Sequence, residues 1–260
     1  NMTGEANVLA LVLDQKDSVD KLAGGDSGYI VLDRSVFYGE GGGQESDRGS
    51  IKIGDWEVLV EDVKRMPNGI YLHSCIIRQG EIKVGDTCQM FVDEEKRKRT
   101  ARNHTATHLL QMALRQVLGD HVKQAGSLVE PGKLRFDFTH MSALSSTELD
   151  VVEGIVNGLI LQDIDVVVKN MTKAESEKHG ALAFFGDKYG DEVRTVSIDG
   201  KMELCCGTHC NYTGEIGSFK ILAESGVGAG IRRIEAITGD AVTKFTNGRL
   251  KILVQAAALL

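Results

Sequence analysis

Histidine residues at a helical spacing are the first feature of this sequence that could do chemistry. His104 and His108 lie four positions apart in a segment with helical periodicity. Residues at this spacing share one helix face about 6 Å apart, so two imidazoles can bind one metal ion. A histidine packed against the neighbouring Leu109 is the simpler interpretation of the pair alone. The pair by itself therefore leaves both interpretations open.

A second stretch, Glu203–Cys210, contains three cysteines and a histidine. A thiolate and the imidazole of His209 four residues away form a compact turn around a glycine. Zinc prefers this mixture of sulfur and nitrogen donors in tetrahedral geometry. The alternative is a group of buried or reactive cysteines beside a surface histidine. Taken together, the two stretches complete four-coordination, and the sequence predicts a zinc site.

Two familiar zinc enzymes are excluded by the same residues. Metalloproteases of the His-Glu-x-x-His type place a glutamate base after the first histidine. Thr105 occupies that position here, so the base of that mechanism is missing. The deaminase pattern His-x-Glu with Pro-Cys-x-x-Cys is also absent from the sequence.

A glycine-rich segment, Phe37–Gly49, is the third feature. It contains consecutive glycines followed by Gln44 and Asp47. Such glycines allow the backbone to approach a ligand closely and to present N–H groups. A long hairpin turn is the simpler interpretation. The spacing matches neither a Walker loop nor a dinucleotide-binding fingerprint.

The elements that must position these residues form two regions, a β-rich one followed by one that is richer in helix. Residues 1–92 alternate short β-type segments with Gly and Asn turns, which predicts a small closed barrel carrying the glycine-rich motif. The expected strands are Val8–Leu13, Tyr29–Leu32, Trp56–Val60, Ile70–His73 and Cys88–Val92. Cys75 and Cys88 lie in or near these apolar segments and are expected to be small core residues.

From Asp93 the pattern becomes helical, and residues 93–240 are predicted to form an α+β zinc-binding core. Asp93 suits the N-cap of a helix that continues towards residue 118, and Gly119 ends it. A second helix is expected over Ser146–Leu161. Further strands are expected at Asp165–Val168, Glu192–Ser197, Phe219–Leu222 and Ile231–Ile237. Residues 241–260 are interpreted as the start of a C-terminal helix that is truncated from a longer chain.

The bulk composition fits a soluble protein without a membrane partner. The 260 residues include no stretch approaching the roughly 20 apolar residues of a membrane helix. A cytoplasmic location is expected, with an organellar matrix as the alternative. Five cysteines, three of them crowded together, do not resemble a secreted disulfide framework.

The net charge of −7 does not favour nucleic-acid binding, so an RNA partner would need local basic patches. Lys96–Arg99 with Arg102 is one candidate, and Arg232 with Arg233 is another. A solvated charged face is the simpler interpretation of both.

The block Arg102–Leu110 resembles the zinc-binding helix of alanyl-tRNA synthetase editing domains and of their free-standing AlaX relatives. A looser version of it occurs in threonyl-tRNA synthetase. Further segments are similar to the same family, and the resemblance runs from about residue 30 to 240. These segments are Phe37–Gly49, Gln124–Val129, Leu134–His140, Ala183–Gly190 and Gly230–Glu235.

The resemblance implies that zinc is held by His104, His108, Cys205 and His209. The family commonly has Cys-Gly-Gly-Thr-His where this chain has Cys205-Cys206-Gly207-Thr208-His209. Cys206 therefore replaces a glycine, and Cys210 stands where an apolar residue is usual. Whether either of these thiols contacts the metal stays open at this point, and so does a sensitivity of the site to oxidation.

The activity implied is hydrolysis of the ester in tRNA(Ala) mischarged with serine or glycine, by the editing part of an alanyl-tRNA synthetase. The rest of that synthetase would be a partner, because no aminoacylation motif occurs in these residues. Alternatives are a free-standing AlaX-like trans-editing deacylase, a non-catalytic zinc-stabilised tRNA-binding module, and a metallohydrolase of small molecules.

Residue roles follow from the same resemblance. Thr107, Gln124 and Gln44 are polar candidates for lining the amino-acid pocket. The amides of Gly42 and Gly43 are candidates for stabilising the oxyanion. The basic residues Arg97, Arg99 and Arg102, just before the metal helix, are candidates for contacting tRNA phosphates. Zinc would either activate water or orient the substrate, and the sequence leaves that choice open.

Overall fold

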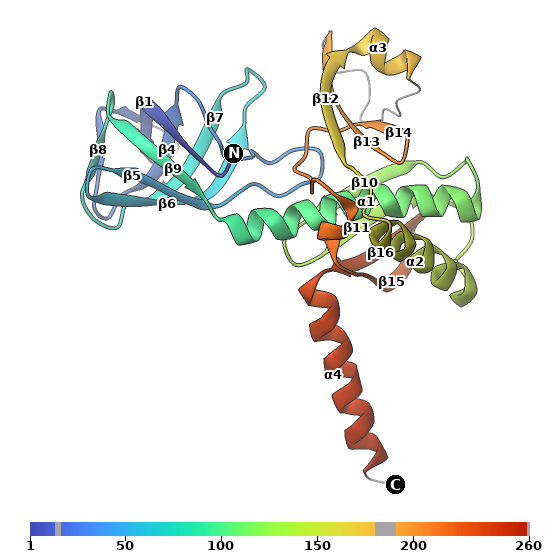
Figure 1. Ribbon diagram of the computed structural model, residues 1–260. Coiled ribbons are helices and arrows are strands. Elements are labelled where there is room, and N and C mark those ends of the chain that lie inside the picture. The colour runs from blue at the N-terminus through green and yellow to red at the C-terminus, as the bar shows by residue number, and fades with distance from the viewer. Residues whose placement is uncertain (14–16, 180–190, 259–260) are drawn as a thin grey trace. The chain divides into compact units, whose positions relative to one another are not determined.

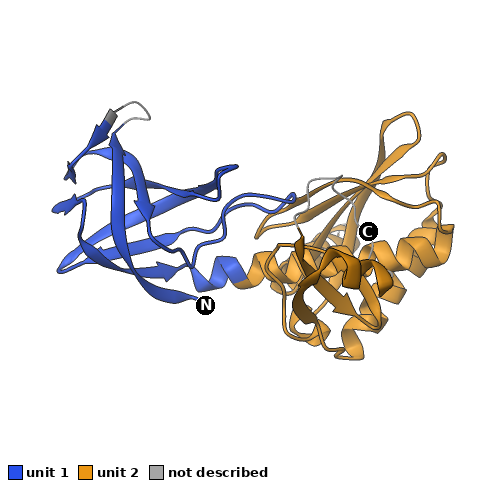
Figure 2. Cartoon of the chain, turned by 90° about the horizontal axis from the view of Figure 1, so that it is seen from above, with its two compact units in different colours: residues 1–97 blue, residues 98–260 orange. Residues whose placement is uncertain are grey.

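The computed structural model describes residues 1–13, 17–179 and 191–258. The chain divides into two compact units, residues 1–97 and 98–260, which are described separately (Figure 2). The family-like segment Ala183–Gly190 lies outside the described residues.

The first unit is a closed antiparallel barrel, as the sequence predicts. Neighbouring strands follow the order β1-β4-β7-β6-β5-β9, and β9 pairs back with β1 to close the ring. Strand β2 extends the sheet beside β1, and β3 pairs with β8. The strands are β1 (Thr3–Leu13), β2 (Asp17–Val19), β3 (Lys21–Ala23), β4 (Ser27–Leu32), β5 (Gly49–Ile53), β6 (Trp56–Arg65), β7 (Tyr71–Ile76), β8 (Glu81–Lys83) and β9 (Thr87–Val92).

Alternating side chains fill the barrel, because successive residues of a strand face opposite sides of the sheet. In β4, Ile30 and Leu32 are buried, and in β9 Met90 is buried. Cys75 and Cys88 are buried free thiols within this core, which confirms their predicted place. Burial raises the pKa of both thiols, that of Cys88 to about 11. These cysteines are small apolar residues rather than reactive ones.

A neutral histidine also lies in the barrel core. His73 is completely buried, and its Nδ1–H donates to the carbonyl oxygen of Ile30 at 2.9 Å. The hydroxyl of Ser35 donates to Nε2 of the same ring at 2.8 Å. Desolvation lowers the pKa of His73 below its ordinary value of 6.5. The folded barrel therefore holds this imidazole without its second proton.

We expect the barrel to lose stability as the pH falls below 6.5, the ordinary histidine pKa. Below pH 6.5 the unfolded chain binds a proton at His73 that the folded barrel does not bind. The stability that the neutral His73 contributes is therefore present above pH 6.5 and lost progressively below it. Urea unfolding followed by fluorescence of Trp56, the single tryptophan and a residue of β6, reports on this unit. The variant H73Q should show a flatter pH dependence. An unchanged slope in H73Q would assign the effect to other groups.

Helix α1 (Glu94–Leu118) carries the first pair of predicted metal ligands. Its N-cap is Asp93, as predicted, because the Asp93 carboxylate accepts the backbone N–H of Lys96 at 3.0 Å. Gly119 ends the helix with a φ of 111°. Helix α2 (Ser146–Leu161) has the predicted bounds and begins with a capping box between Ser145 and Glu148.

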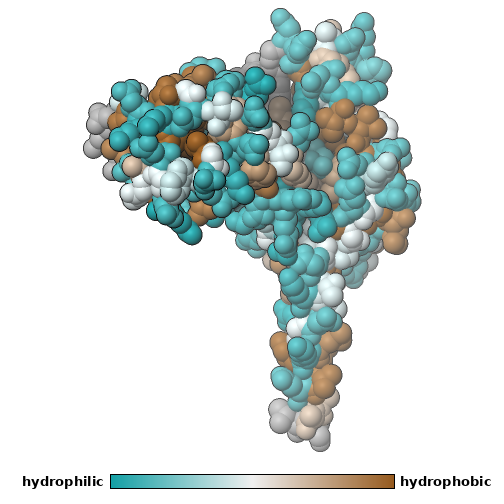
Figure 3. Space-filling model, turned by 60° about the vertical axis from the view of Figure 1, so that its left-hand side comes forward, coloured by the Kyte–Doolittle hydropathy of each residue, from teal (hydrophilic) through white to brown (hydrophobic). Residues whose placement is uncertain are grey.

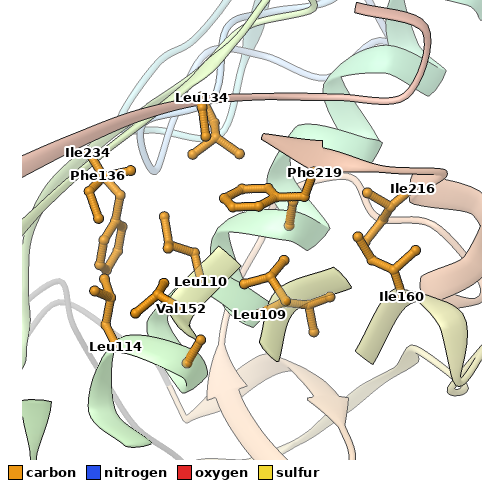
Figure 4. Packing of buried hydrophobic residues seen from close by; sticks show 14 of the residues in the cluster. Leu109, Leu110, Leu114, Leu134, Phe136, Val152, Ile160, Ile216, Phe219 and Ile234 are labelled. Atoms are coloured by element: carbon orange, nitrogen blue, oxygen red, sulfur yellow. The ribbon is translucent and has the colours of Figure 1, made fainter. Parts of the chain in front are cut away.

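The second unit builds its core between these helices and an antiparallel sheet of order β10-β11-β16-β15. In Figure 4, Leu109, Leu110 and Leu114 of α1 lie beside side chains from the sheet and from α2. The strands are β10 (Gln124–Val129), β11 (Leu134–Thr139), β15 (Phe219–Gly228) and β16 (Ile231–Thr238). The α+β class of the second unit is therefore as predicted.

A smaller sheet presents the cysteine-containing turn. It has the order β12-β13-β14, from β12 (Val167–Thr172), β13 (Glu192–Ile198) and β14 (Lys201–Leu204), with α3 (Lys173–Lys178) following β12. The 3-10 helix η1 (Thr213–Ile216) follows the cysteine turn. The strand expected from Asp165 begins at Val167 instead. The preceding residues are used elsewhere, because Asp165 bridges to Tyr212 and the Val166 N–H donates to the Asn211 carbonyl at 2.8 Å.

Helix α4 (Asp240–Ala257) follows β16 and extends away from the sheet of the second unit (Figure 1). None of its described residues is buried. Apolar side chains appear on the surface of this helix in Figure 3. Its exposed large apolar residues are Leu250, Ile252, Leu253 and Val254. Within the described residues, every helix is too short or too polar to cross a membrane.

Candidate metal centre

The structure brings the four predicted ligands together. One donor atom from each of His104, His108, Cys205 and His209 lies within 4.8 Å of the others. The two histidines of α1 project from one helix face, and the other two residues come from the turn that follows β14. The side chains converge because the turn packs against α1, and metal binding by them stays a prediction.

The contacts within this cluster centre on the Cys205 sulfur. Sγ of Cys205 lies 3.4 Å from Nε2 of His104 and 3.2 Å from Nε2 of His209. Nε2 of His108 is buried and has no hydrogen-bond partner among the described residues. A buried nitrogen without a partner is costly, and a metal ion would satisfy its lone pair.

The outer nitrogens of two rings are held by side chains that are not ligands. Nδ1 of His108 contacts the carboxylate of Glu203, and Nδ1 of His209 lies 3.3 Å from the hydroxyl of Thr105. Metal-binding histidines almost always donate their second N–H in this way, which orients the ring and sets its tautomer. The arrangement therefore resembles a metal site beyond the four donors themselves.

Burial and neighbouring charges shift the pKa values of three residues of the cluster. Burial opposes ionisation of the Cys205 thiol, but the surrounding imidazoles lower its pKa far below the ordinary value. Burial lowers the pKa of His209 to about 3. Burial also opposes protonation of His108, yet Glu203 and Cys205 raise its pKa to about 10.

A divalent ion fits the charge of these residues. The Cys205 thiolate and the Glu203 carboxylate together carry two negative charges in a buried place, which an ion of charge +2 neutralises. Three imidazoles and one thiolate are the nitrogen and sulfur donors that zinc takes in tetrahedral sites. The donor set thus fits zinc better than magnesium or calcium, which take oxygen.

The spare cysteines have other environments. Cys206 is exposed, and the cluster found in the described residues does not include it. Cys210 is buried, and burial raises the pKa of its thiol to about 11. Its backbone N–H donates to the Thr105 hydroxyl at 3.1 Å. Of the three thiols, only that of Cys205 belongs to the described cluster.

The glycine-rich segment belongs to the first unit. Gly41 and Gln44 exchange backbone hydrogen bonds of 3.2 and 3.0 Å across a turn. Gly42 and Gly43 between them have φ values of 59° and 82°. Two consecutive positive φ angles define a type I′ hairpin turn, which glycine adopts without strain. The hairpin interpretation is therefore confirmed, and the proposed oxyanion role of these two amides stays a prediction.

The three candidate arginines are engaged within the protein. Both the Nε and the terminal amino groups of Arg97 donate to the Asp47 carboxylate, and Arg97 also donates to the Val36 carbonyl. Arg99 pairs with Asp240 at 2.9 Å. Arg102 donates to the Glu215 carbonyl at 3.0 Å. The Arg97 side chain is only 11% exposed, so its main role here is to hold the end of the glycine-rich segment.

The two remaining candidates belong to the second unit. Thr107 lies on α1 and is buried, and its hydroxyl donates to the Asn103 carbonyl at 2.9 Å. Gln124 begins β10, and its amide donates to the Ser127 hydroxyl at 3.1 Å. A surface cavity of about 610 Å³ borders Glu203, Arg115 and Lys201, but none of the four cluster residues lines it. A pocket role for Thr107 and Gln124 stays a prediction.

Glu203 and Thr105 are the residues for which the sequence suggested no role. The contact of Glu203 with His108 joins positions 95 residues apart, and that of Thr105 with His209 joins positions 104 residues apart. Neither contact has a local signal in the sequence.

Comparison of the sequence with known proteins places this chain in a family. Residues 1–96 match the model of class II (A) tRNA synthetases, and residues 193–235 match the threonyl and alanyl tRNA synthetase second additional domain. The alanine–tRNA ligase of Listeria monocytogenes is 45% identical over 262 residues, which cover 100% of this chain and 30% of that ligase. The chain belongs to the alanyl-tRNA synthetase family.

Other alanine–tRNA ligases match the chain to a similar extent. The alanine–tRNA ligase of Acetivibrio thermocellus is 48% identical over 258 residues, covering 98% of this chain and 29% of the ligase. The alanine–tRNA ligase of Nitrosomonas europaea is 46% identical over 254 residues, covering 97% of this chain and 29% of the ligase. The chain thus spans about 30% of the length of these synthetases. The match to the second additional domain includes Cys205 and His209 of the cluster, and Glu203, which contacts His108.

Proposed function

We propose that this chain is the editing part of an alanyl-tRNA synthetase, a zinc-dependent deacylase of tRNA(Ala) mischarged with serine or glycine. The observation that carries the proposal is the convergence of three imidazoles and one thiol, the nitrogen and sulfur donors that zinc takes in tetrahedral sites. Its partners would be tRNA(Ala) and the rest of the synthetase, in the cytoplasm.

A synthetase for alanine needs such a second site. A pocket sized for alanine cannot strongly exclude glycine, which is smaller, or serine, which adds only a hydroxyl. A second site that forms hydrogen bonds to the serine hydroxyl rejects alanine, because its polar groups would remain unpaired with alanine. This contact selects serine only, since glycine has no hydroxyl. Hydrolysis at the second site then removes the wrong amino acid.

The roles proposed for the chain's own residues follow the chemistry of ester hydrolysis. When bound, zinc would supply Lewis-acid chemistry, either by activating water or by orienting the substrate. His104, His108, Cys205 and His209 would hold it, and Glu203 and Thr105 contact two of the rings. Thr107 and Gln124 are proposed to recognise the serine hydroxyl, and Gln44 with the Gly42 and Gly43 amides to contact the substrate from the glycine-rich turn.

Contacts to tRNA are proposed for the basic side of α1. Arg99 and Arg102 are partly exposed and bond at their inner sides to Asp240 and the Glu215 carbonyl. The guanidinium group of Arg102 has further donors that can face a phosphate. The engagement of Arg97 by Asp47 makes Arg97 the least accessible of the three arginines. We therefore place tRNA contact on Arg102 first.

The test is deacylation of Ser-tRNA(Ala) and Ala-tRNA(Ala) by the zinc-loaded chain, beside a simple serine ester. We expect Ser-tRNA(Ala) to lose its amino acid at least about a hundredfold faster than Ala-tRNA(Ala), the discrimination that a hydroxyl-binding site achieves. Hydrolysis of the free ester alone would identify a small-molecule hydrolase instead. Zinc and tRNA binding without any hydrolysis would identify a non-catalytic module.

A further inference from the structure

The hydroxyl of Thr105 is a junction between parts of the metal cluster that are distant in sequence. Thr105 is completely buried on α1, between the two histidines of the helix. Its Oγ1 lies 2.9 Å from the Ala101 carbonyl, 3.1 Å from the Cys210 amide nitrogen and 3.3 Å from Nδ1 of His209. The hydroxyl therefore connects the helix backbone, the cysteine turn and one metal-binding ring.

The protons and lone pairs available on each group determine which atom donates in these three contacts. The Ala101 carbonyl can only accept, so it takes the single hydroxyl proton of Thr105. The Cys210 amide can only donate, so it occupies one oxygen lone pair. The second lone pair faces Nδ1 of His209, which must then carry a proton. His209 is thereby held as the tautomer whose Nε2 lone pair is free to bind a metal.

Nε2 of His209 is the atom that lies beside the Cys205 sulfur, at 3.2 Å. The opposite tautomer would point an N–H at the metal position and remove one ligand. A hydroxyl performs this orientation without adding charge. Glu203 already contributes one carboxylate through His108, so a second carboxylate would leave the buried site with excess negative charge.

We propose that Thr105 is a positioning residue for the metal, which selects the binding tautomer of His209 and fixes the Cys205–Cys210 turn against α1. The inference rests on the proposed function, because it concerns the same zinc site. Thr105 does not touch the metal or the substrate. Its effect should appear first as metal affinity rather than as a loss of catalysis by a fully loaded enzyme.

Thr107 provides a matched control. It is a buried threonine two positions along the same helix, and its hydroxyl makes the same 2.9 Å bond to the carbonyl four residues earlier. The variants T105V and T107V remove one hydroxyl each at nearly constant volume. T105S keeps the hydroxyl and should restore the contacts. T105A removes the hydroxyl without adding a second methyl group, in case valine disturbs the packing.

The measurement is the apparent zinc dissociation constant by competition with a chromophoric chelator, together with thermal unfolding of the metal-free proteins. We expect T105V and T105A to bind zinc about 10–100-fold more weakly than wild type, the usual effect of losing an orienting partner. T105S and T107V should bind close to wild type. The metal-free T105V and T107V proteins should unfold at similar temperatures.

Wild-type affinity in both T105V and T105A would overturn the inference. Equal weakening in T107V would also overturn it, since the effect would then come from any buried hydroxyl of the helix. A wild-type chain that binds no zinc would defeat the proposed zinc site, and this inference with it. Zinc binding by the wild type thus tests the proposed function. The zinc affinities of the variants test the role of Thr105.

Discussion

Replacing His104 and Cys205 together by alanine is expected to abolish stoichiometric zinc binding and to slow hydrolysis of Ser-tRNA(Ala) by about a thousandfold or more. The double variant removes an imidazole from α1 and the only thiolate of the described cluster. Stabilisation of the developing charge by a metal is worth several kcal/mol, and each 1.4 kcal/mol corresponds to about tenfold in rate. The effect should therefore be large.

The matched control is C206A, because Cys206 is the adjacent cysteine but is exposed and outside the described cluster. Zinc content by atomic absorption and single-turnover deacylation should be measured on the same samples. C206A should keep both zinc and activity. Full deacylation by a double variant that contains no zinc would disprove a metal role in the reaction. Loss of zinc in C206A would instead revise the ligand set.

The variant R97A is expected to destabilise the first unit by about 3–5 kcal/mol, the usual cost of leaving one member of a buried ion pair without its partner. The Asp47 side chain is 5% exposed, and two guanidinium nitrogens of Arg97 bind its carboxylate. The same carboxylate accepts the Tyr38 N–H at 2.5 Å, so it also holds the start of the glycine-rich segment. Without Arg97, the buried charge has lost its principal partner.

A double-mutant cycle separates the pair from its surroundings. The variant D47A/R97A should be more stable than R97A, because it no longer buries an unpaired carboxylate. R48A removes the arginine of the exposed pair with Glu45 and should have a much smaller effect. Urea unfolding followed by Trp56 fluorescence gives the free energies. Equal effects of R97A and R48A would show that the Asp47 pair does not stabilise the barrel.

Local patterns in the sequence predicted the elements that carry the site. The cap at Asp93 and the glycine at 119 mark the ends of α1, and the spacing of His104 and His108 places both rings on one face. The barrel was predicted from many short β-type segments separated by turn residues. These features depend on neighbours within a few residues, so a single sequence contains the information.

Strand β11 was not predicted, although its residues Leu134–Thr139 alternate between apolar and polar side chains. In the structure Phe136, Asp137 and Phe138 are all buried. Asp137 is tolerated there because Arg233 binds its carboxylate through two hydrogen bonds. That pairing joins residues 96 positions apart. No local pattern could show it.

The same limit applies to the candidate site. The arginines in the first turns of α1 suggested phosphate contacts, but Arg97 is bound by Asp47, 50 positions earlier in the chain. Glu203 reaches His108 across 95 positions. Residue types and spacing therefore indicated the metal ligands. The groups that orient those ligands depend on tertiary contacts, and they became visible only in the structure.

The ligand pairs have a consequence for folding as well as for chemistry. His104 and Cys205 are 101 residues apart, and the intervening chain includes α2, β10 and β11. An ion bound to both pairs would be a cross-link that closes this loop. For a covalent link, the chain-entropy model assigns about 4–5 kcal/mol to closing a loop of roughly 100 residues. Zinc would thus join α1 to the turn after β14. A backbone cut between His104 and Cys205 would leave two fragments still connected through the ion.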